Sequence, residues 1–329
     1  MKIAVFSTKS YDQEYFEKYN GEYNYNFTYF ETALKASTTN LTSGFDAVCV
    51  FVNDVIDEET LKILSANNIQ LIALRCAGYN NVDVEAAKSH NIKIVRVPAY
   101  SPEAVAEHAI ALILTLNRKT HKAYNRVREG NFSLKNMIGF NLKGKTIGVI
   151  GTGQIGATFI KVIRGFGCKI NAFDISKNKE LLDLGVEYLD LNEVFKHADI
   201  LSLHCPLNQH TKHIIKEKSI ALMKEGVMII NTSRGGLVNT ADVIEGLLTK
   251  KIGYLGIDVY EQEENLFFKD LSEHIIQDEL ILRLMSFPNV LITSHQAYFT
   301  KEAMEEITLT TLENIKAFKN NLELENEIK

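Results

Sequence analysis

The sequence lacks the features that mark several large classes of protein. Its longest apolar stretch, Ala109–Leu116, is far short of the roughly 20 residues that a membrane-spanning helix needs. It has no low-complexity tract, no block of like charges and no repeat with a period of about 20–50 residues. Its net charge of −5 offers no basic surface for nucleic acid. We therefore expect neither a membrane protein nor a nucleic-acid-binding protein.

The four cysteines, at positions 49, 76, 168 and 205, have no CxxC spacing. Scattered thiols are typical of a reducing compartment rather than of a disulfide framework or a zinc site. The start, MKIAVFSTKS, enters a strand-like run without the pattern of a signal peptide. His210 and His213, in HTKH, are spaced like metal ligands, but no second ligand pair is evident, so we expect a solvated loop or helix face. The prediction is a cytoplasmic protein without a metal site.

The length of 329 residues indicates about two domains, and 46% hydrophobic with 23% charged residues is ordinary for a globular protein. Apolar runs and helical stretches alternate through the first hundred residues, which predicts buried parallel strands with helices between them. The predicted strands are Ile3–Ser7, Ala47–Val52, Leu71–Leu74 and Ile92–Val97, and the predicted helices include Glu58–Ala66 and Val84–Ser89. A long helical bridge follows from Ser101 to Gly130, with one possible break.

A second alternating series predicts a doubly wound sheet of six strands. These strands are Thr146–Ile150, Ile170–Phe173, Ile200–His204, Val227–Asn231, Tyr254–Asp258 and Val290–Thr293. One last helix, Lys301–Lys319, follows with no further strand, so we expect it to return to the first domain. The second domain, residues 101–298, is then inserted into a first domain made of residues 1–100 and 299–329. The cleft between two domains is the default place for an active site.

The segment GVIGTGQIG, at 148–156, has the full context of a dinucleotide-binding fingerprint. It follows the strand KTIGVI and opens a helix. Gly151 permits the tight turn, Gly153 lets the backbone approach a pyrophosphate, and Gly156 lets helix and strand pack closely. Gln154 and Ile155 supply N–H groups where the helix dipole favours an anion. The second domain is therefore predicted to be a Rossmann domain.

Asp174 ends the next strand, 18 residues beyond Gly156, where a carboxylate can accept hydrogen bonds from a ribose. Its charge would repel a 2′-phosphate, so NAD is predicted rather than NADP; the alternative is an acidic residue that caps a turn. Ligands of open parallel sheets lie beyond the carboxyl ends of the strands. The further cofactor-binding candidates at such ends or in the loops after them are His204, Cys205, Pro206, Thr211, Thr232, Ser233, Arg234 and Asp258.

Hydride transfer to a carbonyl needs an acid for the oxygen, and nine histidines compete for this role. His108 and His121, on the bridge, are predicted to pack, and most of the others to be solvated. His204 ends a sheet strand and His295 closes the last strand, NVLITSH, where the chain passes between domains. Position favours His295, but the residues alone leave the choice open.

Several segments together resemble the D-specific 2-hydroxyacid dehydrogenases, and among them the bacterial fermentative D-lactate dehydrogenases. The segments are RCAGYNNVD at 75–83, VPAYSPEAVAEHA at 97–109, NTSRGG at 231–236, DVYEQE at 258–263 and SHQA at 294–297. The resemblance implies an NAD-dependent oxidoreductase that reduces pyruvate to D-lactate. It also implies two doubly wound parallel-sheet domains, the Rossmann domain being inserted into a flavodoxin-like substrate domain, in a homodimer or homotetramer.

The resemblance also implies roles for individual residues. Arg234, Glu263 and His295 match the family's catalytic positions, and Glu261 is the less favoured neighbour of Glu263. Arg234 would grip the substrate carboxylate, His295 would protonate the carbonyl oxygen, and Glu263 would orient the imidazole. Tyr100 resembles the family residue whose hydroxyl reaches the substrate carboxylate. From their position in the sequence, the N–H groups of Gly78 and Tyr79, in the turn after a predicted strand, can bind the same carboxylate, and Phe299 and Tyr298, beyond His295, could close on a small methyl.

Two other readings remain open at this point. The chain could act on a bulkier 2-oxo acid, or on glycerate or phosphoglycerate, although 329 residues leave no room for the regulatory domain that some phosphoglycerate dehydrogenases append. The same family includes corepressor-like proteins that use the fold as an NAD-sensing scaffold for partners. An intact set of Arg234, Glu263 and His295 does not exclude that function.

Overall fold

The chain forms two α/β units, and the second is inserted into the first, as predicted. The computed structural model describes residues 1–329, except for the side chain of Asn265. Unit 1 consists of Met1–Ser101 and Tyr298–Lys329, and unit 2 of Pro102–Ala297. Ser101 and Tyr298 thus lie in unit 1, although the sequence placed both in the inserted domain. Tyr298 belongs there because its ring packs on Phe51 and Tyr100.

Unit 1 contains a five-stranded parallel sheet in the order β2-β1-β3-β4-β5, which is the flavodoxin-like order. Its strands are β1 (Lys2–Val5), β2 (Asn26–Tyr29), β3 (Ala47–Val50), β4 (Leu71–Leu74) and β5 (Lys93–Arg96). Every residue of β3 and β4 is buried, as expected for a sheet that is covered on both faces. The sequence predicted four of these strands and missed β2, an edge strand whose residues are only half-buried or exposed.

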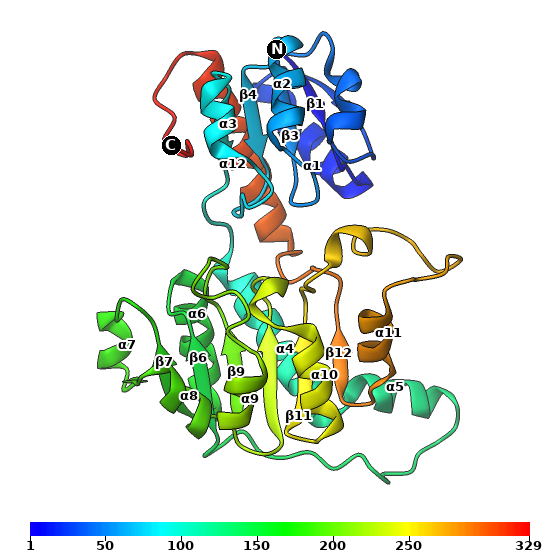
Figure 1. Cartoon of the computed structure of the whole chain (residues 1–329), viewed down its shortest axis with the longest axis vertical. Coiled ribbons are helices and arrows are strands. Elements are labelled where there is room, and N and C mark those ends of the chain that lie inside the picture. Colours follow the sequence, from blue (N-terminus) through cyan, green and yellow to red (C-terminus); the bar gives the residue numbers. More distant parts are fainter. The chain divides into compact units, whose positions relative to one another are not determined.

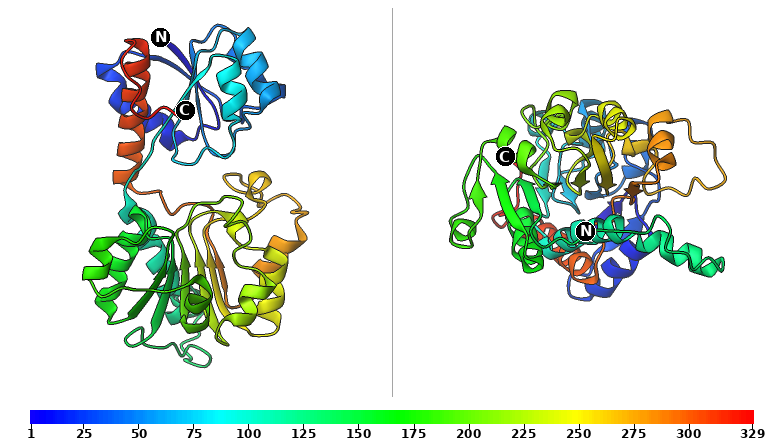
Figure 2. Two further views of the ribbon diagram at one scale, coloured as in Figure 1. Left: turned by 60° about the vertical axis from the view of Figure 1, so that its left-hand side comes forward. Right: turned by 90° about the horizontal axis from the view of Figure 1, so that it is seen from below.

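Helices cover both faces of this sheet (Figure 1). Phe16 of α1 and Leu312 and Ile315 of α12 pack on one face, and Leu61 and Leu64 of α2 pack on the other. Figure 2 shows α12, in red and orange, alongside the strands of unit 1, so the last helix returns to the first domain as predicted. The helices of unit 1 are α1 (Ser10–Tyr19), η1 (Asn20–Glu22), η2 (Ala36–Thr42), α2 (Glu58–Ala66), α3 (Val84–Ser89) and α12 (Lys301–Lys319).

Unit 2 contains a seven-stranded parallel sheet in the order β12-β11-β10-β9-β6-β7-β8. Counted from β6, this is the Rossmann order 3-2-1-4-5-6 with one more strand at the edge. The strands are β6 (Thr146–Ile150), β7 (Lys169–Phe173), β8 (Glu187–Tyr188), β9 (Ile200–Leu203), β10 (Val227–Asn231), β11 (Ile252–Ile257) and β12 (Val290–Ile292). The prediction contained six of them, since the two residues of β8 are too few to give a periodic pattern.

The helices of unit 2 form a layer on each face of its sheet. Ile113 of α4 and Ile160 of α6 belong to one buried cluster, and Val243 of α10 and Ile281 of α11 to the other. The helices are α4 (Pro102–Arg118), α5 (Thr120–Arg128), α6 (Gln154–Ile163), η3 (Arg164–Phe166), α7 (Lys179–Asp183), α8 (Leu191–His197), α9 (Glu217–Leu222), η4 (Gly235–Leu237), α10 (Thr240–Leu248), η5 (Glu263–Asn265) and α11 (Glu279–Ser286).

The predicted bridge is two helices rather than one. Lys119, between α4 and α5, has a left-handed backbone with φ 53°, which interrupts the helix. From residue 129 to the start of β6 the chain has neither helix nor strand. In the described part of the chain, no helix combines the length and the apolar character that crossing a bilayer requires.

Candidate active site

The glycine-rich turn joins β6 to α6, and close backbone approach requires two of its glycines. Gly151 has φ +94°, and a Cβ there would lie 2.5 Å from the Cys205 nitrogen. A Cβ on Gly156 would lie 2.0 Å from the Gly151 carbonyl oxygen. A Cβ on Gly153 would meet nothing within 4 Å, so packing within the protein does not explain this glycine. The open space at Gly153 fits the predicted approach of a pyrophosphate to the N-terminus of α6.

Asp174 lies directly after β7, and its carboxylate is joined to the glycine-rich turn. Its Oδ2 accepts from the Thr152 N–H at 2.5 Å and from the Thr152 hydroxyl at 3.1 Å, while Oδ1 accepts from the Ser176 N–H at 3.1 Å. An ionised carboxylate has about four acceptor positions, so Oδ1 keeps capacity for one more donor. A ribose hydroxyl fits that position.

Two buried polar atoms near the ends of β9 and β10 have no hydrogen-bond partner among the described residues. They are Nδ1 of His204 and the hydroxyl of Thr232. The other nitrogen of His204 is 2.8 Å from the Ser202 hydroxyl, and its ring packs on Phe159. Burial lowers the pKa of His204 to about 3, so this imidazole is neutral and is a poor general acid.

The neighbouring cofactor candidates hold the local backbone. The Thr211 hydroxyl donates to the Pro206 carbonyl oxygen at 2.6 Å, and the Ser233 hydroxyl donates to the Cys205 carbonyl oxygen at 2.7 Å. Burial raises the pKa of Cys205 to about 11, which keeps the thiol protonated. These hydrogen bonds hold the loops at the carboxyl ends of β9 and β10, where NAD is predicted to bind.

His295 and Glu263 are brought together from segments 32 residues apart. His295 Nδ1 lies 2.8 Å from Glu263 Oε1, and the second oxygen of Glu263 accepts from the Tyr260 N–H at 2.8 Å. Their side chains are 14% and 21% exposed, so the pair is shielded but reachable. The Phe268 ring packs on the imidazole with the ring centroids 5.7 Å apart. Because Nδ1 faces the carboxylate, Nε2 is the nitrogen left for a substrate.

Glu261 is committed elsewhere. Its Oε1 lies 2.5 Å from His213 Nε2, and its Oε2 accepts from the N–H and the hydroxyl of Thr240 at 3.2 and 3.1 Å. The hydrogen bonds therefore show that Glu263, and not Glu261, is the partner of His295, a distinction that the residues alone did not provide. They also correct the expectation that His213 is a solvated residue. Within the described residues, no cluster of three or more His, Cys, Asp or Glu could hold a metal ion.

Arg234 follows β10 and precedes the short helix η4. Its Nη1 donates to the Ser233 carbonyl oxygen at 2.7 Å, and its own carbonyl oxygen accepts from the Asn231 side chain at 2.9 Å. A Cβ on Gly235 would lie 2.1 Å from the Tyr260 carbonyl oxygen, so only glycine fits after Arg234. The backbone is thus held on both sides while the guanidinium keeps further N–H groups for a ligand.

The carboxylate of Asp258, which the sequence suggested as a cofactor contact, forms hydrogen bonds within unit 2. Its side chain has no exposed surface. Both carboxylate oxygens accept hydrogen bonds from the segment around His295, namely from the N–H groups of Gln296 and Ala297. These bonds hold the backbone of the turn that carries His295.

In unit 1, the predicted substrate residues lie at the carboxyl ends of the strands. Gly78 and Tyr79 are in the turn after β4, and the Arg96 guanidinium lies 5.2 Å from the centre of the Tyr79 ring. Phe299 is 47% exposed and meets the ring of Tyr11 edge-on at 4.6 Å. The sequence did not predict this contact of Tyr11, since Tyr11 lies in the first turn of the polar helix α1 and nothing in its local sequence connects it with position 299.

Aromatic rings continue this group inside unit 1. Tyr298 is buried, and it lies 6.1 Å from Tyr100 and 6.0 Å from Phe299, measured between ring centres. Burial raises the pKa of Tyr298, and burial together with the nearby Asp12 raises that of Tyr11, so both hydroxyls stay neutral. The arrangement is a cluster of aromatic rings in unit 1, of which Phe299 is the exposed member.

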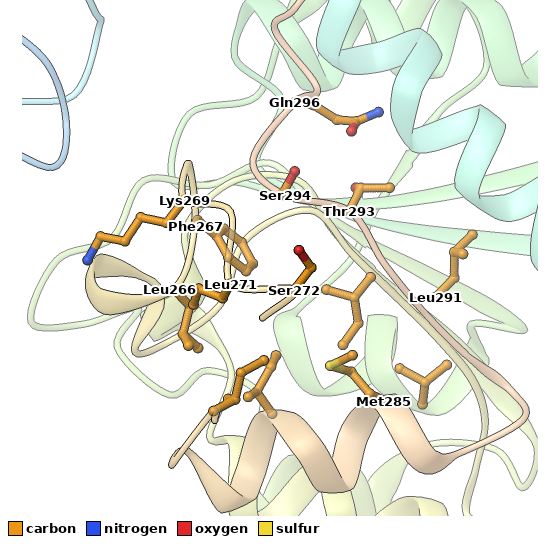
Figure 3. A pocket seen from close by; sticks show the side chains of 14 residues that line it. Leu266, Phe267, Lys269, Leu271, Ser272, Met285, Leu291, Thr293, Ser294 and Gln296 are labelled. Atoms are coloured by element: carbon orange, nitrogen blue, oxygen red, sulfur yellow. The ribbon is translucent and has the colours of Figure 1, made fainter. Parts of the chain in front are cut away.

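A separate pocket of about 620 Å³ lies at the β12 edge of unit 2 (Figure 3). Leu266, Phe267 and Met285 line it together with Thr293, Ser294 and Gln296, which flank His295. None of the residues of the glycine-rich turn lines it. The pocket is therefore not the predicted cofactor site, although it borders the segment that carries His295.

Comparisons with known proteins bear on this geometry. The family described as "D-isomer specific 2-hydroxyacid dehydrogenase, NAD binding domain" matches residues 110–297. The D-lactate dehydrogenase of Escherichia coli is 48% identical over 328 residues, which cover 100% of both chains. The chain belongs to the D-isomer specific 2-hydroxyacid dehydrogenases.

Two further relatives support this membership. A 2-hydroxyacid dehydrogenase homolog of Haemophilus influenzae is 49% identical over 326 residues, or 99% of this chain and 98% of the relative. The solved structure of the pyruvate reductase of Chlamydomonas reinhardtii has a TM-score of 0.93 at 40% identity, covering 99% of this chain and 98% of that one. As a member of the family, this dehydrogenase uses NAD. The space at Gly153, the remaining acceptor position of Asp174 and the unpartnered Thr232 hydroxyl fit that cofactor.

Proposed function

We propose that this dehydrogenase is a D-lactate dehydrogenase, which reduces pyruvate to D-lactate. The observation that carries the proposal is the hydrogen bond of 2.8 Å between His295 Nδ1 and Glu263 Oε1. A carboxylate on Nδ1 fixes the orientation of the ring, so that Nε2 is the nitrogen that can donate a proton to a substrate. NADH supplies the hydride when it is bound.

In this proposal, three side chains of unit 2 act on the 2-oxo acid. His295 donates its Nε2 proton to the carbonyl oxygen as the alcohol forms, and Glu263 holds the orientation of the imidazole ring. Arg234 binds the substrate carboxylate through its planar fork, which a lysine could not reproduce. Two hydrogen bonds orient Arg234 for this contact. The Asn231 side chain donates to the Arg234 carbonyl oxygen, and the Arg234 guanidinium donates to the Ser233 carbonyl oxygen.

Residues of unit 1 are proposed to make further contacts with the substrate, including its carboxylate. The N–H groups of Gly78 and Tyr79 would bind the carboxylate, and the Tyr100 hydroxyl would reach the same group. Phe299, which is 47% exposed, would face the substrate methyl, and this favours a small acid such as pyruvate. The names of the relatives from E. coli and C. reinhardtii agree with this substrate, whereas the H. influenzae relative carries only the general name.

The experiment is a comparison of 2-oxo acids with the purified protein and NADH. We expect pyruvate to be the best substrate and the turnover of 2-oxobutyrate to remain measurable. One additional methylene in an apolar pocket changes kcat/KM only about 10–200-fold. Chiral chromatography should find D-lactate. Faster turnover of 2-oxoisocaproate would replace pyruvate with a bulkier acid, and L-lactate would contradict the proposal. NADH binding without turnover of any 2-oxo acid would favour the corepressor-like function.

Cofactor preference tests the Asp174 assignment. We expect strong preference for NADH over NADPH, since the carboxylate would lie against the extra phosphate. Asp174→Ala should weaken NADH binding and narrow the preference, as measured by kcat/KM for each cofactor. Because the carboxylate also accepts from Thr152, the matched variant Thr152→Val should perturb the turn while it keeps the charge, and thus the preference. Equal use of both cofactors by the unaltered protein would argue against this role.

We also propose that the protein forms a homodimer or a homotetramer through unit 2, as the family resemblance implies. Segment 129–145 exposes apolar side chains that a second copy could cover. Phe132 is 74% exposed, Leu134 84% and Ile138 85%. Isolated apolar residues are common on surfaces, but three within seven residues favour an interface. Sedimentation analysis measures the state directly.

A further inference from the structure

The turn that carries His295 depends on one buried carboxylate. His295 has a left-handed backbone with φ 55°, which is unfavourable for a residue with a side chain. Its N–H donates to the Asp258 carbonyl oxygen at 2.7 Å. The next two N–H groups, of Gln296 and Ala297, donate to Asp258 Oδ1 and Oδ2 at 2.9 and 2.8 Å. Asp258 thus accepts three consecutive N–H groups and holds the turn in shape.

The Asp258 carboxylate in turn needs donors, because a buried charge without partners is costly. Burial alone would raise the pKa of Asp258, but hydrogen bonds from His108, Thr293 and Gln296 outweigh it and lower the pKa, so the group is ionised. The Thr293 hydroxyl donates to Oδ1 at 2.5 Å. The donor that comes from outside this segment is His108 of α4.

His108 reaches both Asp258 and Thr293, although it lies 185 residues before Thr293 in the chain. Its Nε2 lies 3.0 Å from the Thr293 hydroxyl oxygen and 3.5 Å from Asp258 Oδ1. The Thr293 hydroxyl gives its single hydrogen to Asp258, so it can only accept from His108, and a carboxylate can only accept. Nε2 of His108 must therefore carry a hydrogen. The side chain, 18% exposed, is held by the bridging helix α4.

We propose that His108 is a positioning residue for the dehydrogenase reaction: it supplies the donor that completes the Thr293–Asp258 network and so fixes the turn that presents His295. This inference rests on the proposed role of His295. It links α4, the helix that begins unit 2, to the backbone of the turn that carries His295 through the hydrogen bonds of Thr293 and Asp258. Figure 3 shows Thr293, Ser294 and Gln296 along the segment after β12, on which this path ends.

The test compares His108→Leu with His108→Gln. Leucine removes the donor, whereas the glutamine amide can place an N–H near the position of Nε2. A displacement of about 1 Å in a catalytic group can cost 10²-fold, so we expect a roughly 10- to 100-fold lower kcat for His108→Leu with little change in KM for NADH. His108→Gln should recover most of the loss. His197→Leu, on an exposed part of α8, is the matched control and should keep the unaltered kcat.

Thr293→Val provides the second arm, because it removes the bridging hydroxyl at nearly constant volume. It should reproduce the His108→Leu loss, and the double variant should be no worse than either single one. Additive losses, or a kcat for His108→Leu equal to that of His197→Leu, would overturn the inference. A packing role alone would predict lower thermal stability with no rescue by glutamine.

Hydrogen exchange separates this inference from the proposed function. In His108→Leu, the amides of Gln296 and Ala297 should exchange faster while those of α6 stay protected. This readout holds even if the unaltered protein reduces no 2-oxo acid, in which case the proposed function fails and the network stands. Unchanged exchange at positions 296 and 297 would overturn the network whatever the activity.

Discussion

Unit 2 contains two histidine–glutamate pairs whose glutamates are only two residues apart. His295 pairs with Glu263 at 2.8 Å, and His213 pairs with Glu261 at 2.5 Å. Both histidines have left-handed backbones, with φ 55° and 51°, and both donate their N–H to a carbonyl oxygen of another segment. By residue type and backbone geometry the two pairs are nearly the same.

The pairs differ in the nitrogen that is used and in what else the carboxylate holds. His213 binds its glutamate through Nε2, the outer nitrogen, whereas His295 uses Nδ1 and leaves Nε2 available. Glu261 also binds the backbone and hydroxyl of Thr240 at the start of α10, so it joins two segments. If His295 alone acts in the reaction, as proposed, then a histidine–carboxylate pair is not by itself a sign of catalysis. The nitrogen that remains free is the informative feature.

Truncation of the two histidines should give the largest contrast. We expect His295→Ala to lower kcat roughly 10²–10⁴-fold, the usual contribution of a general acid, with the fold intact. His213→Ala should leave kcat within a few-fold but cost about 1 kcal/mol of folding stability, because Glu261 loses a partner. Steady-state kinetics and urea unfolding of both variants measure the two effects. A comparable loss of kcat in His213→Ala would mean that the second pair also acts in the reaction.

Amide replacement of the glutamates should give a smaller contrast in the same direction. Glu263→Gln keeps the size but removes the charge that holds Nδ1–H, so kcat should fall roughly 10- to 10²-fold by loss of orientation. Glu261→Gln should retain a bond to Thr240 and change kcat little. The measurement is kcat for pyruvate reduction at a fixed pH. Equal kcat values for the two variants would remove the distinction between the pairs.

Much of the fold could be predicted because it depends on local patterns. The bounds of β4, β6, β10 and α12 are those of their apolar runs and caps, and the glycine-rich turn identified the Rossmann unit. The strand β2 was missed because NFTY alternates half-buried and exposed residues at an edge, next to a segment rich in tyrosine and asparagine. Burial on both faces is what makes a parallel strand visible in a sequence.

The site was less predictable, since its decisive contacts join distant segments. Resemblance selected Glu263 over Glu261, but only the Thr240 and His213 bonds show what occupies Glu261. His108 was expected to pack on the bridge, and its approach to Thr293 spans 185 residues. Hydrogen bonds of that range leave no periodic signal in the chain.

His204 offers a third histidine, one that pairs with a hydroxyl and no carboxylate, and its effect should appear in stability rather than in rate. Its pKa is lowered to about 3 by burial, against an ordinary value near 6.5. Between these values the unfolded chain binds a proton that the folded chain does not, so stability falls as the pH is lowered from about 6.5 to about 3. The slope from this one group is at most about 1.4 kcal/mol per pH unit.

His204→Gln should remove that part of the slope even if it lowers stability at every pH. Ser202→Ala is the matched control, because it takes away the partner of Nε2 but leaves the buried imidazole, and should retain the slope. Urea unfolding followed by circular dichroism at several pH values suits a chain that has no tryptophan. If both variants kept the slope of the unaltered protein, His204 would be charged or exposed in solution. The contrast among the three histidines would then rest on the two glutamate pairs alone.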